Sequence, residues 1–507
     1  MFKNALVSVS DKTGLVEFLK PLAAKGLRIV STGGTAEHLK AAGLQITELK
    51  EQTGFPEVMG GRVKTLHPRI HMPILARDFE ASDLELLKKE GLEPFDLVIV
   101  NLYPFEETLL KKDRDGLGEQ DLIEKIDIGG PTLLRASAKN FSRITVVADP
   151  RDYEWISSQG QTSLEDRKKL AGKVFAHVSR YDSLISQWLG AVNGPELSFG
   201  GSKVLDLRYG ENPNQKASWY ATSGDRKGLH TAKILQGKAL SYNNILDLEA
   251  ASQLAREFDE PTAVAVKHNN PCGVGMAESL LIAVERAAAA DPVSVFGGIV
   301  AVNREIDADV AELLGKIFLE CVVAPKISAA ALEVFAKKKN LRVLEWPDLM
   351  TCERGTEIRT LAGGFLTQTP QDLGSSTANW KFLGEVPGDA VMKDLQFAEK
   401  VCAALKSNSI AIVKNGQTLG LGMGQVNRVE AVAHAVTRMK SHHKITNQMV
   451  LASDAFFPFP DSIEKASEAG VKWILQPGGS LRDEEVFAAA RRLGVNMVLT
   501  GERHFRH

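Results

Sequence analysis

Short apolar runs alternate with helical patterns along the first part of the chain. The apolar runs occupy residues 5–10, 27–31, 96–105 and 144–149. Between the first two runs, apolar residues recur at helical spacing at Leu15, Phe18, Leu19 and Leu22. Runs such as VIV and TVV are apolar at every position, which is typical of strands in a parallel sheet covered by helices. The pattern therefore predicts repeated βαβ units.

A long helical pattern at residues 163–189 precedes a segment rich in Gly, Ser and Pro at 190–202. That segment has no apolar periodicity, as expected of a domain boundary. Beyond it, apolar runs again alternate with alanine-rich helical stretches, so the second part is also α/β. We expect one domain at 1–193 and a larger one at 203–507, which a polar, irregular stretch near 366–390 divides.

Composition agrees with a folded protein of several domains. A length of 507 residues corresponds to about three folding units. The 61 Lys and Arg residues against 63 Asp and Glu leave no basic excess for nucleic acid or an anionic membrane. The four cysteines form no Cys-x-x-Cys pair, which argues against a zinc knuckle or disulfide framework and favours a reducing cytoplasm. No apolar stretch reaches about 18 residues, so membrane spanning is disfavoured.

Two polar turns follow predicted strands of the first domain. STGGT at 31–35 follows one strand and opens a helix, and SDKTG at 10–14 follows another. Backbone N–H groups, hydroxyls and a helix N-terminus can converge on a phosphate at the carboxyl edge of a parallel sheet. A tight turn without a ligand explains STGGT equally well.

Three later segments carry titratable side chains. GGRVKTLHP at 60–68 suits a phosphate or an oxyanion, but it also suits a solvated basic loop. NLYPF ends a buried strand at Tyr103, whose hydroxyl can donate to a developing charge. DIGGPTLLRASAKN contains Asp127 and Lys139, which can share proton transfer or can form an ordinary surface ion pair.

The densest polar signal of the second part is KHNNPCG at 267–273, directly after an apolar strand. Lys267 and His268 reach one ligand only if the chain turns there, because successive strand residues face opposite sides. A satisfied loop histidine is the alternative. Zinc deaminases need H-x-E and P-C-x-x-C. His268 is followed by two asparagines and Cys272 by Val-Gly-Met, so we do not expect metal-activated water.

Two further segments suit a nucleotide or a heterocycle. RYGENPNQ begins with Arg208 and Tyr209. The Arg208 guanidinium suits bidentate recognition of a phosphate, and the Tyr209 ring lies next to it in the sequence. SDAFFPFPD at 453–461 places aromatic residues beside proline, where they can stack on a flat heterocycle or form a small core cluster.

The ordered motifs resemble those of a known family. They are SVSDKTG, STGGT, RVKTLHP, NLYPF, IDIGG, LRASAKN, RYGENPNQ, KHNNPCG, VFGGIVAVN, SDAFFPF and RHFRH. The set resembles the bifunctional purine biosynthesis family that joins aminoimidazole carboxamide ribotide (AICAR) transformylase to inosinate cyclohydrolase. The resemblance implies an α/β chain with an N-terminal methylglyoxal-synthase-like parallel-sheet domain. It implies a larger transformylase domain of two cytidine-deaminase-like α/β subdomains.

The resemblance implies two consecutive reactions. A formyl group passes from 10-formyltetrahydrofolate to AICAR, giving formyl-AICAR (FAICAR), which then closes with loss of water to inosine monophosphate (IMP). For ring closure it implies catalysis by Lys64, Tyr103, Asp127 and Lys139. The nucleotide in that domain would be held by Ser10, Asp11, Lys12, Ser31, Thr32, Gly33, Gly34, Thr35, Arg62, Val63, Thr65, Asn101, Leu102, Ile128 and Gly129.

For formyl transfer the resemblance implies His268 as the base and Lys267 as an electrostatic stabiliser. Ribotide binding would involve Arg208, Tyr209, Gly297, Glu320, Asn408 and Arg428. Folate binding would involve Val429, Phe456, Asp461, Ser480 and Arg503. The resemblance also implies 10-formyltetrahydrofolate as cosubstrate, no catalytic metal, and a cytoplasmic homodimer with sites near the interface. Neither nucleic acid nor a membrane is an expected partner.

Two positions depart from the family pattern. Met72 and Pro73 stand where a paired glycine is usual, and we expect a differently shaped loop because proline fixes φ and removes a donor. Glu320 stands where an Asp can occur, which keeps the charge and lengthens the reach. Two other classes compete with the enzyme. A nucleotide-sensing protein would not need the titratable residues of both sites, and a metal-dependent deaminase lacks its ligands.

Overall fold

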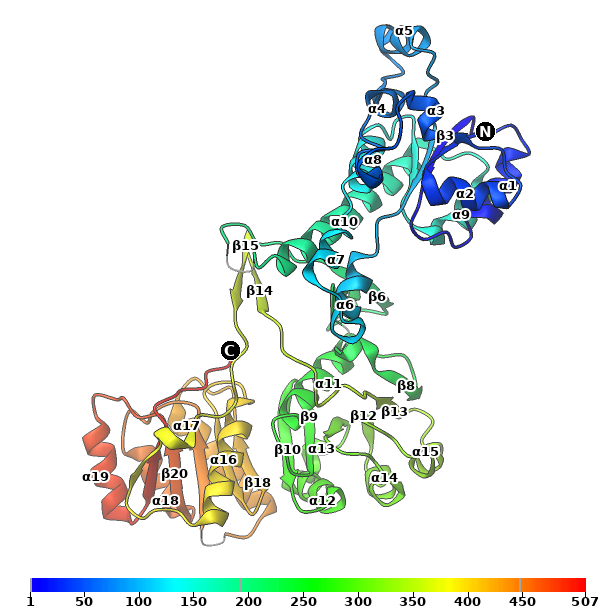
Figure 1. Ribbon diagram of the computed structural model, residues 1–507. Helices are drawn as coiled ribbons and strands as arrows, with labels where there is room; N and C mark the ends of the chain where they lie inside the picture. The colour runs from blue at the N-terminus through cyan, green and yellow to red at the C-terminus, as the bar shows by residue number, and fades with distance from the viewer. Residues whose placement is uncertain (1, 192–193, 226, 446–447) are drawn as a thin grey trace. The chain divides into compact units, whose positions relative to one another are not determined.

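Figure 1 shows the computed structural model, which describes residues 2–191, 194–225, 227–445 and 448–507. The chain forms two compact units: Met1–Ser202 with Thr222–Asp225, and Lys203–Ala221 with Arg226–His507. Residue 193, where we expect the first domain to end, lies outside the described residues. Within the described residues, no helix combines the length and apolar character needed to cross a membrane.

A five-stranded, wholly parallel sheet forms the core of the first unit. In spatial order its strands are β3 (Thr47–Glu48), β2 (Arg28–Ser31), β1 (Asn4–Ser8), β4 (Leu97–Val100) and β5 (Thr145–Val147). Every residue of β4 and β5 is buried, as expected when helices cover both faces of a sheet. The predicted parallel α/β fold is confirmed.

Helices connect these strands. They are α1 (Leu15–Ala23), α2 (Gly33–Ala41), α3 (Leu49–Thr53), η1 (Met59–Gly61), α4 (Pro68–Leu75), α5 (Ala81–Lys89), α6 (Phe105–Asp115), α7 (Glu119–Ile123), α8 (Gly129–Lys139), η2 (Pro150–Asp152), α9 (Tyr153–Gln159) and α10 (Leu164–Trp188). At the start of α10, Ser163 Oγ accepts from the Asp166 N–H at 3.1 Å, and the Asp166 carboxylate accepts from the Ser163 N–H at 3.0 Å. This capping box begins the helix predicted at 163–189.

Met72 and Pro73 lie inside helix α4, which begins at Pro68. The segment is therefore a helix in this chain, and a shape different from that of the family stays a prediction. The Pro73 carbonyl accepts hydrogen bonds from the Phe95 N–H at 3.2 Å and from Arg143 Nη2 at 2.9 Å. Bonds from two neighbouring segments of the same unit thus hold the Pro73 carbonyl in place.

The second unit contains a mixed twelve-stranded sheet. In spatial order its strands are β16 (Lys381–Leu383), β21 (Asn496–Leu499), β20 (Val471–Gln476), β19 (Met449–Ser453), β17 (Ile410–Lys414), β18 (Gln417–Gly422), β10 (Asn270–Met276), β9 (Thr262–Lys267), β11 (Gly298–Val302), β12 (Leu319–Ala324), β13 (Arg342–Glu345) and β8 (Lys233–Gln236). Two further strand pairs are β6 (Gly201–Leu207) with β7 (Ala217–Thr222), and β14 (Glu357–Leu361) with β15 (Gly364–Gln368).

Two halves of the large sheet repeat the same order of elements. The first half runs β8, α11, the β9–β10 hairpin, α12, β11, α14, β12, α15 and β13, and the second runs β16, α16, the β17–β18 hairpin, α17, β19, α18, β20, α19 and β21. β10 and β18 meet antiparallel at the centre through the pair Gly275 and Gln417. The halves are therefore related by an approximate twofold axis between these strands.

The helices of the second unit follow this repeat. Their bounds are α11 (Tyr242–Ala255), α12 (Leu280–Ala290), α13 (Pro292–Val295), α14 (Ala308–Gly315), α15 (Ala329–Phe335), α16 (Asp389–Ala403), α17 (Arg428–His442), α18 (Asp461–Glu468) and α19 (Asp483–Leu493), with short turns η3 (Leu229–Thr231) and η4 (Thr377–Asn379). The chain crosses from the first half to the second between β13 and β16, through the fully exposed β14–β15 hairpin. The stretch 366–390, where we expect the split, contains the end of this hairpin and β16.

Close packing of a helix on a glycine also recurs in both halves. A Cβ atom on Gly275 of β10 would lie 2.2 Å from the Ala283 carbonyl oxygen of α12. A Cβ atom on Gly422 of β18 would lie 2.0 Å from the Ala431 carbonyl oxygen of α17. Only glycine allows a helix backbone to come this close to a strand. In both halves, a glycine in the central hairpin strand thus allows a helix to pack directly on the strand backbone.

Candidate active sites

Loops of the first unit converge on one cavity of about 710 Å³. Because β1, β2 and β4 are parallel, the loops that follow them lie at the same edge of the sheet. Segments 60–65 and 123–130 complete the wall. The cavity brings together these predicted residues: Ser10, Lys12, Thr32, Gly34, Thr35, Arg62, Lys64, Thr65, Asn101, Tyr103, Asp127, Ile128 and Gly129. An adjoining cavity of about 280 Å³ includes Ser31, Gly33 and Val63.

The Asn101 side chain fixes the loop after β1. Its Oδ1 accepts from the N–H groups of Ser10 at 2.6 Å and Asp11 at 3.0 Å, while its Nδ2 donates to the Asp11 carbonyl at 2.8 Å. The Asp11 carboxylate in turn binds the Thr13 hydroxyl and N–H, which lowers its pKa. Asp11 is therefore used to cap its own loop, whereas Lys12 extends along the cavity wall.

The hydroxyls of STGGT bind the protein itself. Ser31 Oγ donates to the Val7 carbonyl at 2.8 Å, and Thr35 Oγ1 donates to the Val9 carbonyl at 2.9 Å. Thr32 is the N-cap of α2, and Gly33 and Gly34 form its first turn, where backbone N–H groups have no partner within the helix. An anion bound at this motif would therefore contact the backbone N–H groups at the N-terminus of α2, because the hydroxyls already bind protein carbonyl groups.

A second helix N-terminus, that of α8, meets the loop that carries Lys64. A Cβ atom on Gly129 would lie 2.3 Å from Thr65 Oγ1, so the absence of a side chain lets the Thr65 hydroxyl lie against the start of α8. Lys64 Nζ lies 3.3 Å from the position of a Cβ atom on Gly33, which places the ammonium beside the start of α2. Arg62 forms an ion pair with Glu124 at the cavity wall. Two positive helix ends and Lys64 thus surround one space.

Asp127 lies where α8 begins. Its carboxylate accepts from the N–H groups of Gly130 at 2.8 Å and Tyr103 at 3.3 Å. Burial raises the pKa of Asp127, and these N–H groups and Lys64 oppose the rise. Burial also raises the pKa of Tyr103, to which the Asp127 charge adds. The pair therefore offers a protonated phenol beside a carboxylate that can exchange a proton.

Lys139 is placed apart from this group. It is the last residue of α8 and is exposed, whereas Gly129, the first residue of that helix, lines the cavity. Ten residues at about 1.5 Å each separate the two helix ends by about 15 Å. Within one chain, the structure does not bring Lys139 to Asp127. Leu102 is also set back, because it is buried with 9% exposure.

The predicted residues of the second unit lie along one edge of the large sheet. Antiparallel neighbours reverse direction, so the ends of β9 and β18 share an edge with the starts of β10, β11 and β17. β19, β20 and β21 are mutually parallel and end at that same edge. This edge carries Lys267, His268, Gly297, Glu320, Asn408, Arg428, Val429, Phe456, Asp461, Ser480 and Arg503.

His268 and Asn269 form the two-residue turn of the β9–β10 hairpin, between the paired residues Lys267 and Asn270. Their φ values are 54° and 62°, as in a type I′ turn. Lys267 Nζ donates to the Phe296 carbonyl at 2.7 Å. Lys267 and His268 both line a cavity of about 160 Å³. The chain reversal that lets both residues reach one ligand is therefore present.

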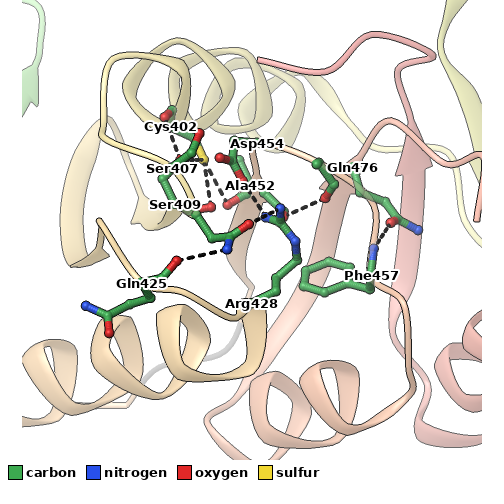
Figure 2. A network of polar contacts seen from close by, with 12 residues as sticks. Cys402, Ser407, Ser409, Gln425, Arg428, Ala452, Asp454, Phe457 and Gln476 are labelled. Carbon is green, nitrogen blue, oxygen red and sulfur yellow. Dashed lines mark hydrogen bonds and ion pairs between the residues drawn. The ribbon is translucent and has the colours of Figure 1, made fainter. Parts of the chain in front are cut away.

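Arg428 lies in a buried polar network that Figure 2 shows. It forms an ion pair with Asp454, and the two residues are 8% and 1% exposed. Arg428 also donates to Ser453 Oγ at 2.8 Å and to Asn408 Oδ1 at 2.7 Å. Asn408 Nδ2 donates to the Gln425 carbonyl at 2.9 Å. Asn408 and Arg428 are thus brought together and held in fixed orientations.

Asn270 joins the His268 turn to this network. Its Nδ2 donates to the His268 carbonyl at 3.0 Å, and its Oδ1 accepts from the Lys406 N–H at 3.2 Å. Lys406 is two residues before Asn408. The turn of the first half and the network of the second half are therefore continuous across the centre of the sheet.

Four other predicted residues contact their own neighbours. Arg208 donates to the Tyr209 hydroxyl at 2.9 Å and stacks on its ring at 4.7 Å, and Glu320 pairs with Arg342 at 2.7 Å. Arg503 lies over the Phe505 ring at 5.0 Å. The His504 N–H donates to the Asp454 carbonyl at 2.8 Å, which places the Arg503 segment at the end of β19. Six steps of about 4.8 Å separate β12 from β19, so Glu320 and the Arg503 segment lie about 29 Å apart along the edge. One chain does not bring both to one ligand.

Sequence reasoning missed two residues that shape these sites. The Tyr181 hydroxyl accepts from the Asp127 N–H at 2.9 Å and donates to the Lys125 carbonyl at 2.7 Å. Asp247 accepts from the Asn269 N–H at 2.6 Å. Each lies inside a helix and contacts a residue far away in the sequence, so local patterns gave no signal for either. Among the described residues, no group of three or more His, Cys, Asp or Glu is placed to hold a metal ion.

Comparison with known proteins gives the family. A family model described as AICARFT/IMPCHase bienzyme matches residues 137–438, and one described as MGS-like domain matches residues 14–132. Proteins named "Bifunctional purine biosynthesis protein PurH" match over 100% of this chain and 100% of their own length. Identities are 48% for Microcystis aeruginosa, 46% for Ruminiclostridium cellulolyticum and 47% for Trichormus variabilis. With these matches along its whole length, the chain belongs to the AICARFT/IMPCHase bienzyme family of bifunctional purine biosynthesis proteins.

Proposed function

We propose that the large cavity of the first unit is the cyclohydrolase site and that the sheet edge with Lys267 and His268 is the formyltransferase site. The protein is a bifunctional enzyme of purine biosynthesis that formylates AICAR and closes FAICAR to IMP. The main support for the first assignment is the 710 Å³ cavity, in which two helix N-termini and Lys64 suit a phosphorylated ligand.

In ring closure, the carboxamide nitrogen of FAICAR attacks the formyl carbon. A C–N bond forms, the formyl oxygen becomes a hydroxyl, and that hydroxyl leaves as water. The Tyr103 phenol, whose pKa is raised, donates a hydrogen bond to the developing oxyanion. The Asp127 carboxylate accepts a proton from the attacking nitrogen, and Lys64 stabilises the carboxylate. We keep the predicted role of Lys139 in proton transfer. This role requires the Lys139 side chain, at the C-terminal end of α8, to reach a cyclohydrolase cavity.

In formyl transfer, the amine of AICAR attacks the formyl carbon of the donor. The new C–N bond forms, the bond from the formyl carbon to the folate nitrogen breaks, and that nitrogen takes a proton. His268 accepts the proton of the attacking amine, and Lys267 stabilises the oxyanion of the tetrahedral intermediate. The support is the turn geometry, which presents both side chains to the same cavity.

The formyl donor is a folate, and we assign 10-formyltetrahydrofolate to the strand ends that carry Val429, Phe456, Asp461, Ser480 and Arg503. Because Glu320 lies about 29 Å along the edge from the Arg503 segment, we assign Glu320 to a site completed by a second copy of the chain in a homodimer. Catalysis proceeds in the cytoplasm without a catalytic metal. Activity should therefore survive treatment with a chelator.

His268→Ala tests the assignment of separate sites. The purified variant should lose formyl transfer by about 10²- to 10⁴-fold, as expected for loss of a general base, while cyclisation of supplied FAICAR stays near wild type. Tetrahydrofolate release and IMP formation are followed separately. The control is His434→Ala, a histidine in the middle of α17. Parallel loss of both reactions in a folded His268→Ala protein would contradict the assignment.

A further inference from the structure

The β17–β18 turn of the second half is the structural counterpart of the β9–β10 turn. It consists of Asn415 and Gly416, with φ values of 51° and 66°. Both N–H groups donate to the carboxylate of Asp394, at 2.7 Å each, and Asp394 lies on the preceding helix α16. Asn-Gly is the pair that type I′ turns favour. This half therefore shows the hairpin turn with its favoured sequence and without a proposed catalytic residue.

In the first half a helix carboxylate also accepts a hydrogen bond from the turn backbone, but the turn sequence is less favourable. Asp247 lies on α11, the counterpart of α16, and its Oδ1 accepts from the Asn269 N–H at 2.6 Å. His268 and Asn269 both have positive φ, yet neither is glycine. Residues with a Cβ resist this conformation, so the turn depends more on the hydrogen bond to its backbone.

The Asp247 carboxylate also interacts electrostatically with the His268 side chain. Burial raises the pKa of Asp247, and the turn N–H groups together with the His268 charge oppose that rise. A half-buried carboxylate therefore lies under the turn that carries the proposed base. The corresponding turn in the other half has the same carboxylate but no ionisable side chain at its two central positions.

We propose that Asp247 is a positioning residue for formyl transfer. By accepting the Asn269 N–H, it holds the two-residue turn in the left-handed conformation that presents Lys267 and His268 to the cavity at the sheet edge. The inference rests on the proposed function of His268. It assigns to Asp247 an effect on the chemical step and little effect on substrate binding.

The test measures kcat and KM for formyl transfer in full-length variants. Asp247→Ala should lower kcat about 10- to 100-fold with KM within about threefold, because a small displacement of a catalytic group is costly. Asp247→Asn keeps an acceptor oxygen and should lose less than about tenfold. Adding Asn269→Gly to Asp247→Ala should recover kcat at least about threefold, since glycine removes the conformational cost of the turn.

Asp394→Ala is the matched control. It removes the same device from the other turn, so it should lower the unfolding temperature as Asp247→Ala does, while kcat stays within about twofold. The proposal is overturned if Asp247→Ala keeps wild-type kcat while His268→Ala loses it, if Asp394→Ala loses kcat equally, or if Asn269→Gly gives no recovery. Wild-type formyl transfer in His268→Ala would overturn the proposed function instead.

Discussion

The carboxylate of Asp127 accepts the backbone N–H of Tyr103 at 3.3 Å and so joins the start of α8 to the end of β4. Burial raises the pKa of both side chains, and the Asp127 charge raises that of Tyr103 further, whereas the Tyr103 N–H lowers that of Asp127. At neutral pH this contact keeps the phenol as a hydrogen-bond donor.

The Asp127 pKa sets the acid side of the cyclisation profile. The deprotonated form accepts the proton, so the rate should fall as pH falls through that pKa. Because burial raises the value, the midpoint should lie above the ordinary 3.8 of an aspartate. The measurement is FAICAR cyclisation against pH under saturating substrate. A midpoint at or below 3.8 would contradict the role of Asp127.

Lys64→Met should move this acid limb to higher pH. The ammonium favours the charged carboxylate and lowers the Asp127 pKa, so its removal should raise that pKa further. The profile of residual activity, normalised to its maximum, reports the shift. Lys88→Met, an exposed lysine on α5, serves as the control and should leave the profile in place. If the midpoint of the acid limb were the same in Lys64→Met as in the wild type, the Lys64 charge would have no effect on the Asp127 pKa.

Lys139→Ala should slow cyclisation while formyl transfer continues, so that FAICAR accumulates in the coupled reaction. IMP formation at the wild-type rate would deny Lys139 an essential role. Because α8 holds Lys139 about 15 Å from Gly129, its reach can be tested by mixing. If Lys139 serves the cavity of a second copy, random mixing of Lys139→Ala with Asp127→Asn should restore about one quarter of wild-type cyclisation. Cyclisation would stay lost if both residues act in one chain.

Gly422→Ala should destabilise the second unit by about 1–3 kcal/mol or more, because its Cβ would lie 2.0 Å from the Ala431 carbonyl oxygen. Urea unfolding monitored by fluorescence measures the loss. Gly315→Ala, at a helical position with no neighbouring atom within 4 Å, should be neutral or slightly stabilising. Equal stability of both variants would contradict the close packing of α17 on β18.

Arg428→Met should cost about 3–5 kcal/mol of unfolding free energy, because it leaves the Asp454 carboxylate buried without its partner. Replacing Asp454 by Leu in the same chain should recover most of that loss. The exposed pair Arg492–Glu464 is the comparison, and Arg492→Met should cost less than about 1 kcal/mol. A small loss for Arg428→Met would show that the Asp454 charge is stabilised by other groups.

Local patterns predicted several elements of the first unit. Strands such as β4 are apolar at every position, and the helical pattern at 163–189 corresponds to α10, so periodicity located both. The partners of individual side chains were not predictable in this way. The Ser31 hydroxyl binds the Val7 carbonyl on a neighbouring strand, and Tyr181 binds Asp127 from 54 residues away. Such contacts depend on the assembled sheet.

The resemblance implies two like subdomains in the second unit, whereas the apolar pattern alone did not reveal their repeat. The halves share the order of elements, but the central residues of their matching turns differ, being His268 and Asn269 in one and Asn415 and Gly416 in the other. By contrast, the distance of Lys139 from the cavity follows from helix geometry alone, since α8 begins at Gly129 and runs without interruption to Lys139. The length of α8 therefore sets this separation, whatever the spacing of the motif.

The single registered pair between β10 and β18, Gly275 with Gln417, joins the two halves of the large sheet. The 160 Å³ cavity that contains the proposed base takes its lining from both halves, with Lys267 and His268 from the first and Thr418, Gly420 and Arg438 from the second. A shift of one half against the other would therefore change the shape of this cavity without any change in the residues that line it.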